Sequence, residues 1–204
     1  MERDEALRRL NELVGRDVHE LAAHHRIPLR GASGNVNKGW AGHVFERYLG
    51  LPLNTAQAPN FGSWELKVIP LKRTRHGTLS FKETLAITMI DAPQVAVTPF
   101  DQSHLLTKLR RAVVVARIVG HDVDQPSFIH SVTPFDLSGD HYTRVRQDYE
   151  EVRSCINDPG RGFSALTGHM GTYVQPRTKG AGHGSTSRAF YARPLFLSLF
   201  INLG

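Results

Sequence analysis

Apolar residues recur along the chain at two spacings, one typical of helices and one typical of strands. Steps of three and four residues near the N-terminus predict two short helices, over residues 4–14 and 18–25, and KGWAGHVFERYL predicts a third over 38–49. The longest predicted helix spans 139–158, where the apolar residues form one stripe that faces the core. That stripe consists of Tyr142, Val145, Tyr149, Val152 and Ile156.

Period-two alternation predicts the strands. SWELKVI (63–69) alternates throughout, and across the basic turn at 72–77 the segment 79–90 is the expected return strand. AVVVARIV (112–119) is typical of a buried strand, and GTYVQPR (171–177) is the strand expected within a glycine-rich tract. Helices that flank a mixed sheet place the chain in the α/β (α+β) class.

The composition indicates a globular protein with a basic surface. The 204 residues are 40% hydrophobic and 22% charged, which suits one medium domain or two small lobes. A net charge of +6 and a pI of about 9.8 permit a polyanionic partner such as nucleic acid without establishing one.

Cysteine content and hydropathy limit the remaining protein classes. A single cysteine, Cys155, excludes an internal disulfide framework and a CxxC zinc site. The N-terminus shows no apolar signal segment, and the most apolar stretch, 194–203, is about half as long as a membrane span. We therefore expect a soluble, cytoplasmic protein with no membrane partner.

Within SWELKVI, a strand places Glu65 and Lys67 on one face. Phosphodiester hydrolysis needs hard oxygen ligands for a divalent cation, and it benefits from a positive charge beside the developing negative charge. A carboxylate and an ammonium side by side meet both needs, and the carbonyl of Leu66 is a further oxygen ligand. The alternative is an ordinary exposed salt bridge, which adds less than ~1 kcal/mol and has no catalytic meaning.

The predicted helix over 38–49 carries Gly39, Gly42 and Glu46 at spacings that set them on one face. Each glycine costs a helix roughly 1 kcal/mol, which suggests that something approaches this face closely. Either a neighbouring element or a DNA backbone meets the glycines. Glu46 then points to the same place, or it is solvated at the edge of the packed surface.

A further helix is expected through HLLTKLRR, with Asp101 or Ser103 as its cap. In that helix His104 lies one turn before Lys108, on the same face. A DNA contact and a packing role at the helix start are both open for His104. No histidine shows paired ligand spacing such as H-E-x-x-H, so zinc is not expected.

Seven segments resemble, in the same order, the MutH family of DNA endonucleases, which includes the mismatch-repair nicking enzyme and related type II restriction enzymes. KGWAGHVFERYLG is similar to the family's K-G-W-x-G-x-x-x-E-x-x-L-G segment, FGSWELKVIP to F…G-x-E-L-K-x-x-P, and SHLLTKLRR to S-H-x-x-x-K-L-x-R. LNELVGRDVHELA, DYEEV, YVQPRTKG and RAFYAR are similar to the remaining segments. The resemblance covers nearly the whole chain.

The resemblance implies a restriction-endonuclease-like fold, a mixed central sheet flanked by helices with two lobes around a DNA cleft. It implies one MutH-like domain over 1–204, in which residues up to about 110 form the catalytic half while 111–204 complete the sheet and supply DNA-recognition segments. It also implies Mg²⁺-dependent cleavage of double-stranded DNA at a short specific site, with Mn²⁺ as a substitute metal, by a monomer or a dimer on the DNA.

Carried over position by position, the resemblance assigns roles to two sets of residues. The catalytic set is Glu46 as the helical acid, Glu65 as a metal ligand, Lys67 as the cation beside the scissile phosphate and Lys108 as a further lysine. With His104 added, the DNA-contacting set is Lys38, His104, Arg177, Lys179, Arg188 and Tyr191. Arg177 is the best candidate for a guanine edge, because a guanidinium fits O6 and N7 together.

Asn60 departs from the family pattern, in which an Asp bridges the metal and the phosphate. An amide offers a neutral oxygen, so a site with Asn60 in place of this Asp should bind Mg²⁺ less well and cleave more slowly. The substitution is engineered to trap uncut DNA, or natural in a slow relative, or compensated by an Asp from elsewhere. We favour the first, because the rest of the set is in place.

The sequence leaves three functions open. A type II restriction enzyme, here in a cleavage-impaired form, is favoured. A MutH-type repair enzyme that nicks DNA and needs a MutL-like activator is the alternative among enzymes. A catalytically silent, sequence-specific DNA-binding protein is the alternative that Asn60 favours.

Overall fold

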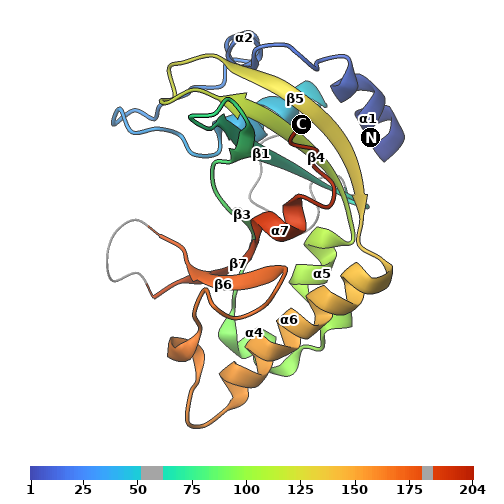
Figure 1. Ribbon diagram of the computed structural model, residues 1–204, viewed down its shortest axis with the longest axis vertical. Coiled ribbons are helices and arrows are strands. Elements are labelled where there is room, and N and C mark those ends of the chain that lie inside the picture. The colour runs from blue at the N-terminus through green and yellow to red at the C-terminus, as the bar shows by residue number, and fades with distance from the viewer. Residues whose placement is uncertain (52–61, 181–185) are drawn as a thin grey trace. The chain divides into compact units, whose positions relative to one another are not determined.

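The computed structural model describes residues 1–51, 62–180 and 186–204. The chain forms two compact units, and it passes between them several times, so that neither unit is a continuous segment (Figure 1). Unit 1 consists of residues 1–83, 112–135 and 201–204, and unit 2 consists of residues 84–111 and 136–200.

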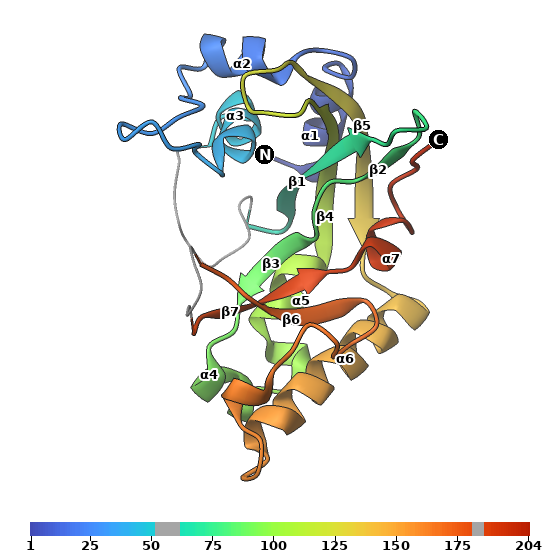
Figure 2. The same cartoon turned by 60° about the vertical axis from the view of Figure 1, so that its left-hand side comes forward.

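The described residues of unit 1 form three helices, α1 (Arg3–Asn11), α2 (Val18–His24) and α3 (Trp40–Tyr48). Figure 2 shows them gathered beside the strands of the unit. All three agree with the predicted helices to within a few residues. Their buried side chains form one cluster with residues of the sheet, which include Leu66, Val113, Val115 and Ile129.

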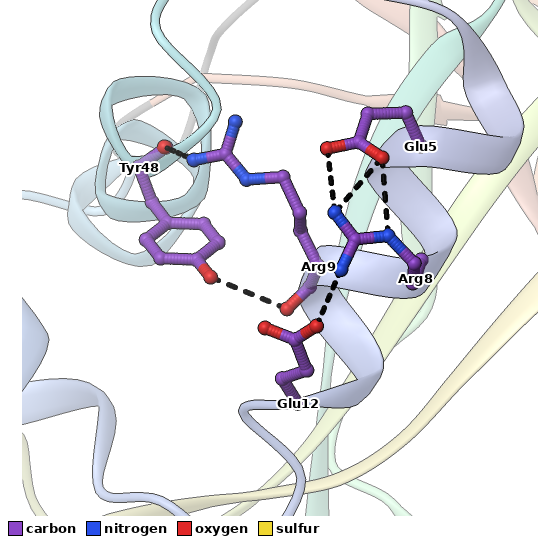
Figure 3. Close-up of polar contacts among 5 residues, drawn as sticks. All are labelled: Glu5, Arg8, Arg9, Glu12 and Tyr48. Carbon is purple, nitrogen blue, oxygen red and sulfur yellow. Dashed lines mark hydrogen bonds and ion pairs between the residues drawn. The ribbon is translucent and has the colours of Figure 1, made fainter.

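Polar contacts attach α1 to the end of α3 (Figure 3). The guanidinium of Arg9 donates to the carbonyl oxygen of Tyr48 at 2.9 Å, and the Tyr48 hydroxyl donates back to the carbonyl oxygen of Arg9 at 3.3 Å. On the solvent side of α1, Arg8 forms ion pairs with Glu5 and Glu12. The reciprocal contacts hold the two helices in one register.

The sheet of unit 1 has the order β2–β1–β4–β5. Strand β1 (Glu65–Arg73) runs antiparallel to β2 (Leu79–Phe81) and parallel to β4 (Arg111–Val119), with Glu65 opposite Ala112. The fourth strand, β5 (Ser127–Asp136), lies where no strand was predicted. The sheet is therefore mixed, and helices flank it, which confirms the predicted α/β class.

Unit 2 contains an antiparallel sheet of order β3–β7–β6, built from β3 (Leu85–Met89), β7 (Arg188–Ala192) and β6 (Val174–Thr178). Its longest helix is α6 (Gly139–Asn157), and Val145, Tyr149 and Val152 of the predicted stripe are buried. The other helices of the unit are α4 (Ala92–Val97), α5 (His104–Leu109) and α7 (Pro194–Leu197), with short 3₁₀ turns at Phe100–Gln102 and Phe163–Ala165.

The prediction of one return strand over 79–90 is wrong. The segment forms two strands, β2 and β3, that belong to different sheets and different units. The break falls at Lys82 and Glu83, which are exposed and interrupt the alternation with consecutive polar residues. The amide of Lys82 still reaches the Pro70 carbonyl at 3.0 Å, and pairing with β1 ends there.

Two smaller expectations are decided by hydrogen bonds and helix lengths. Ser103 is the cap of α5, because its hydroxyl accepts from the amide of Leu106 at 3.1 Å. In the part of the chain that the structure describes, no helix is both long enough and apolar enough to cross a membrane.

Candidate functional site

Glu65 and Lys67 stand at the start of β1 on one face of the strand. Lys67 Nζ lies 2.8 Å from Glu65 Oε1, and the two side chains form an ion pair. The intervening Leu66 points the other way, into the cluster that packs against the helices of unit 1. The pair therefore occupies the sheet face opposite that cluster.

Burial separates this pair from an ordinary surface salt bridge. The Glu65 side chain is 3% exposed and that of Lys67 is 16% exposed. Removing two charges from water is costly, and a buried pair contributes little net stability compared with apolar residues. The arrangement is one in which a carboxylate is held in a low-dielectric place beside a cation that keeps some access to solvent.

The donor chemistry at Glu65 suits a divalent metal only in part. A carboxylate is the hard oxygen ligand that Mg²⁺ takes from proteins, and the backbone carbonyl of Leu66 is next to it. Asn60, the third predicted ligand, lies outside the described residues. Within the described ranges, no group of three or more His, Cys, Asp or Glu side chains is placed to hold a metal ion.

Helix α3 clarifies the role of the two glycines near Glu46. Gly39 is the residue before the helix, not part of it, and a methyl group there would meet the ring of His43 at 3.2 Å. A methyl group on Gly42 would meet no described atom within 4 Å. Packing against a described element therefore does not require a glycine at position 42. Glu46 follows one turn later and is half-buried.

Lys108 and His104 belong to unit 2, on helix α5. Lys108 is buried, with 9% of its surface exposed. His104 Nε2 lies 3.1 Å from Nε2 of Gln94, so its ring has a partner within the unit. Their predicted places in the catalytic and DNA-contacting sets stay predictions.

The predicted DNA-contacting residues near the C-terminus occupy two faces of the unit 2 sheet. The Arg177 guanidinium lies 5.7 Å from the centre of the Tyr191 ring and donates to Thr84 Oγ1 at 2.9 Å. Lys179 is the residue after β6, and its amide donates to the Ser187 carbonyl oxygen at 3.0 Å. Arg188 is on the other face, 5.9 Å from the ring of Phe163. One face thus collects Arg177 and Tyr191.

The acids of the DYEEV segment have structural partners. Both Asp148 oxygens accept backbone N–H groups, from Thr172 at 2.7 Å and from Tyr173 and Val174 at 2.7 and 2.8 Å. The Glu151 carboxylate accepts from the amide of Gly171 at 3.0 Å. These carboxylates fix the turn that leads into β6.

Sequence reasoning missed Arg117, which is half-buried on β4 and lines a cavity of about 500 Å³ together with Lys38. A signal was present in AVVVARIV. Arg117 follows Val113 and Val115 at steps of two, so it occupies a position on the face that contacts the helices. A charged residue at such a position is unusual in a protein core.

Comparison with known proteins gives three results. Residues 49–147 match the family model described as DNA mismatch repair enzyme MutH. The chain is 28% identical over 195 residues to the type II restriction enzyme Sau3AI of Staphylococcus aureus. That match covers 90% of this chain and 37% of the relative, so the chain spans little more than a third of that protein's length. A solved structure titled restriction endonuclease MvaI–cognate DNA substrate complex is similar with a TM-score of 0.39 and 14% identity, over 98% of each chain.

Proposed function

We propose that this chain, in which residues 49–147 match the MutH family model, is a sequence-specific, Mg²⁺-dependent endonuclease that hydrolyses duplex DNA, of the type II restriction class. The observation that supports this most is the buried Glu65–Lys67 pair at the start of β1. It falls within the matched residues 49–147, as does Lys108. The similarity to a type II restriction enzyme over most of the chain favours cleavage over nicking.

The roles follow from the chemistry of each side chain. Glu65 and the Leu66 carbonyl would hold the metal, which when bound polarises the scissile phosphate and supplies a nucleophilic water near neutral pH. Lys67, 2.8 Å from Glu65, would place its positive charge beside the oxygen on which negative charge develops. Glu46 completes the proposed set in unit 1, and the role of Lys108, in unit 2, rests on the family resemblance alone.

Asn60 is the proposed cause of impaired cleavage. An amide at the position of the expected Asp removes one of two metal-binding charges. The proposal therefore predicts weak or undetectable activity for the chain as it stands and a large gain for Asn60→Asp. The metal would be Mg²⁺, with Mn²⁺ tolerated in its place.

The test compares Asn60→Asp with the double variant Asn60→Asp/Glu65→Gln on plasmids of varied sequence, with Mg²⁺ and with EDTA. Cleavage is expected for the first protein with Mg²⁺ only, and not for the second. Activity that is equal in the two proteins, or absent from both on every substrate, contradicts the proposed function. Single-strand nicks that need an added MutL-like activator would instead support the repair enzyme.

A silent DNA-binding protein is the second candidate, and the residue that favours it is Asn60. Such a protein would bind duplex DNA with salt-dependent affinity because it neutralises phosphates. Its Asn60→Asp variant would bind equally well and still not cut.

A further inference from the structure

Arg117 holds a position that the fold otherwise gives to apolar residues. It lies opposite Pro70 in the ladder of β1 and β4, on the face where Val113 and Val115 join the cluster against the helices. Its guanidinium lies 4.9 Å from the centre of the Trp40 ring, and its Nη1 donates to Ser127 Oγ at 2.7 Å. Trp40 is 3% exposed, so the cation rests on a fixed, covered aromatic surface.

The hydrogen bonding of this guanidinium is incomplete. Among the described residues, Nε of Arg117 is buried and has no hydrogen-bond partner. Burial lowers the pKa of Arg117 to about 10, and Glu83 opposes the shift only through charge attraction. The group is still charged at neutral pH. A buried charge without a close counter-ion is costly. Because protein covers Nε, an anionic partner would meet the terminal nitrogens of the guanidinium and offset its charge.

The cavity beside Arg117 has the charge and size for such a partner. It measures about 500 Å³ and carries Arg30, Lys38 and Lys82 as further cations, against the carboxylates of Glu83 and Asp122. The lining is therefore net positive. At the rim, Arg30 is fixed by an ion pair with Asp124 at 2.5 Å, while Lys38 and Lys82 are exposed. The volume lies in the range of sites that hold small organic ligands and exceeds the need of a lone inorganic ion.

This cavity is separate from the Glu65–Lys67 pair. Arg117 is five residues beyond Ala112, the partner of Glu65 in the ladder, which places it about 17 Å further along the sheet. The two sites also face opposite sides of the sheet. Arg117 pairs with Pro70, which is on the same strand face as Leu66, and Glu65 is on the other face. A ligand in the cavity cannot be the scissile phosphate held at Glu65.

We propose that this cavity binds a phosphate group carried on a nucleotide unit, with Arg117 as the central ligand and Lys38 at the rim. A guanidinium offers paired N–H donors that match phosphate oxygens, and the surrounding ammonium groups add charge without geometric demand. The Trp40 ring is covered by the guanidinium and by His19, and the phosphate is the part of the ligand that Arg117 would recognise. Its source is either the DNA backbone away from the cut or a free nucleotide.

The direct readout is the Nε–H signal of Arg117 in the ¹⁵N–¹H NMR spectrum of the labelled full chain, identified by its loss in Arg117→Gln. Spectra are recorded in EDTA, where no cleavage occurs, with thymidine 5′-monophosphate, with thymidine, and with a 12-base-pair duplex. A shift with the nucleotide and not the nucleoside supports a free-nucleotide site, and a shift with the duplex alone supports a backbone contact. No shift with either phosphate-bearing probe overturns the proposal.

Affinity measurements on variants provide the second arm. Arg117→Gln should weaken binding of the responding probe at least about ten-fold, because a hydrogen bond to a charged group is lost. Arg16→Gln removes an equal charge from an exposed site in the same unit and should change affinity less than about two-fold. If Arg117→Gln does not fold, Lys38→Gln on the exposed rim replaces it, with a loss of about three-fold expected. The proposal is overturned if Arg117→Gln, or Lys38→Gln in its place, loses no more affinity than Arg16→Gln.

This inference does not rest on cleavage. The NMR and affinity tests use the chain with Asn60 in place and no divalent metal, whereas the test of the proposed function measures cutting by Asn60→Asp. If Asn60→Asp cuts DNA but no probe shifts the Arg117 signal, only the phosphate-binding proposal is refuted. If the Arg117 signal responds but Asn60→Asp does not cut, only the proposed nuclease function is refuted.

Discussion

Two buried carboxylates, Glu65 in unit 1 and Asp148 in unit 2, are almost equally hidden from solvent, at 3% and 4% exposure. Their partners differ. Asp148 accepts three backbone N–H groups of one turn, which cannot move without unfolding it. Glu65 faces the flexible ammonium of Lys67, on the residue two further along the same strand.

The difference separates a carboxylate built for structure from one suited to chemistry. Backbone donors satisfy Asp148 by fixed geometry and leave no room for a changing ligand. A lysine side chain can rotate away when a metal or phosphate binds. Holding the two charges where water is largely excluded costs free energy. Burial alone therefore does not distinguish the two acids, whereas the groups that face them do.

The largest expected effect is the loss of cleavage in Glu65→Gln, made in the Asn60→Asp background. Loss of a metal-binding charge should reduce the rate at least about 1000-fold, equivalent to about 4 kcal/mol of transition-state stabilisation. Urea unfolding should show a smaller loss of stability than Asp148→Asn, because Lys67, which is 16% exposed, can turn toward solvent when its partner loses its charge. Single-turnover cleavage with saturating protein measures the effect. A rate within ten-fold of that of Asn60→Asp would contradict the proposed catalytic role of Glu65.

Asp148→Asn should have the opposite profile. The amide nitrogen would face N–H donors at the turn, which leaves two like groups opposed, and the free energy of unfolding should fall by about 3 kcal/mol. The change in urea midpoint at constant m-value measures this loss. When Asp148→Asn is made in the Asn60→Asp background, the DNA cleavage rate per folded molecule should stay near that of Asn60→Asp alone. A normal midpoint with lost cleavage would reverse the assignment of the two carboxylates.

Tyr149, the residue after Asp148 in helix α6, gives a pH-dependent test of the structural role of this segment. Burial raises the pKa of the Tyr149 hydroxyl to about 12, and the nearby Glu150 adds to the shift. The raised folded pKa means that the stabilising contribution is complete below the unfolded pKa of about 10 and is lost as pH rises toward 12. Unfolding free energy should fall over this window, and Tyr149→Phe should flatten the fall. An unchanged slope in that variant would contradict the prediction.

The smallest effect is expected at the exposed ion pairs of α1. Arg8 contacts Glu5 and Glu12 at 2.9 and 2.7 Å, with its side chain 61% exposed (Figure 3). Arg8→Ala should lower the urea midpoint only slightly at low salt, and this small shift should largely disappear at high salt because the ion pairs are screened. Urea melts at low and high ionic strength measure it. A loss of stability as large as that of Asp148→Asn would contradict the expectation that buried, backbone-bonded carboxylates stabilise the fold more than exposed ion pairs do.

Sequence periodicity predicted the central strand and the shared face of Glu65 and Lys67 because a strand has one fixed side-chain period. It did not predict the burial of Glu65, since alternation does not say whether one face of a sheet or both are covered. The strand break at Lys82 and Glu83 was missed because two short strands in different sheets look like one in sequence.

The DNA-contacting set shows a second limit. Arg177 and Arg188 both lie in segments that resemble the family, yet the register of β6 and β7 sends them to opposite faces of the sheet. The pairing of two strands is a tertiary property that neither segment encodes alone. Arg117 was not predicted as a site residue because the valines, alanines and isoleucine around it are typical of a buried strand, and only the structure reveals the Trp40 contact and the cavity that it lines.

The most direct test of the central claim is to sequence the DNA ends produced by Asn60→Asp from a pool of duplexes of random sequence with Mg²⁺. The account predicts ends that cluster at one short sequence, with none above background when Lys67→Met is added or when EDTA replaces Mg²⁺. Ends that are absent, scattered over all sequences, or unchanged by Lys67→Met would show that the Glu65–Lys67 pair is not a nuclease centre.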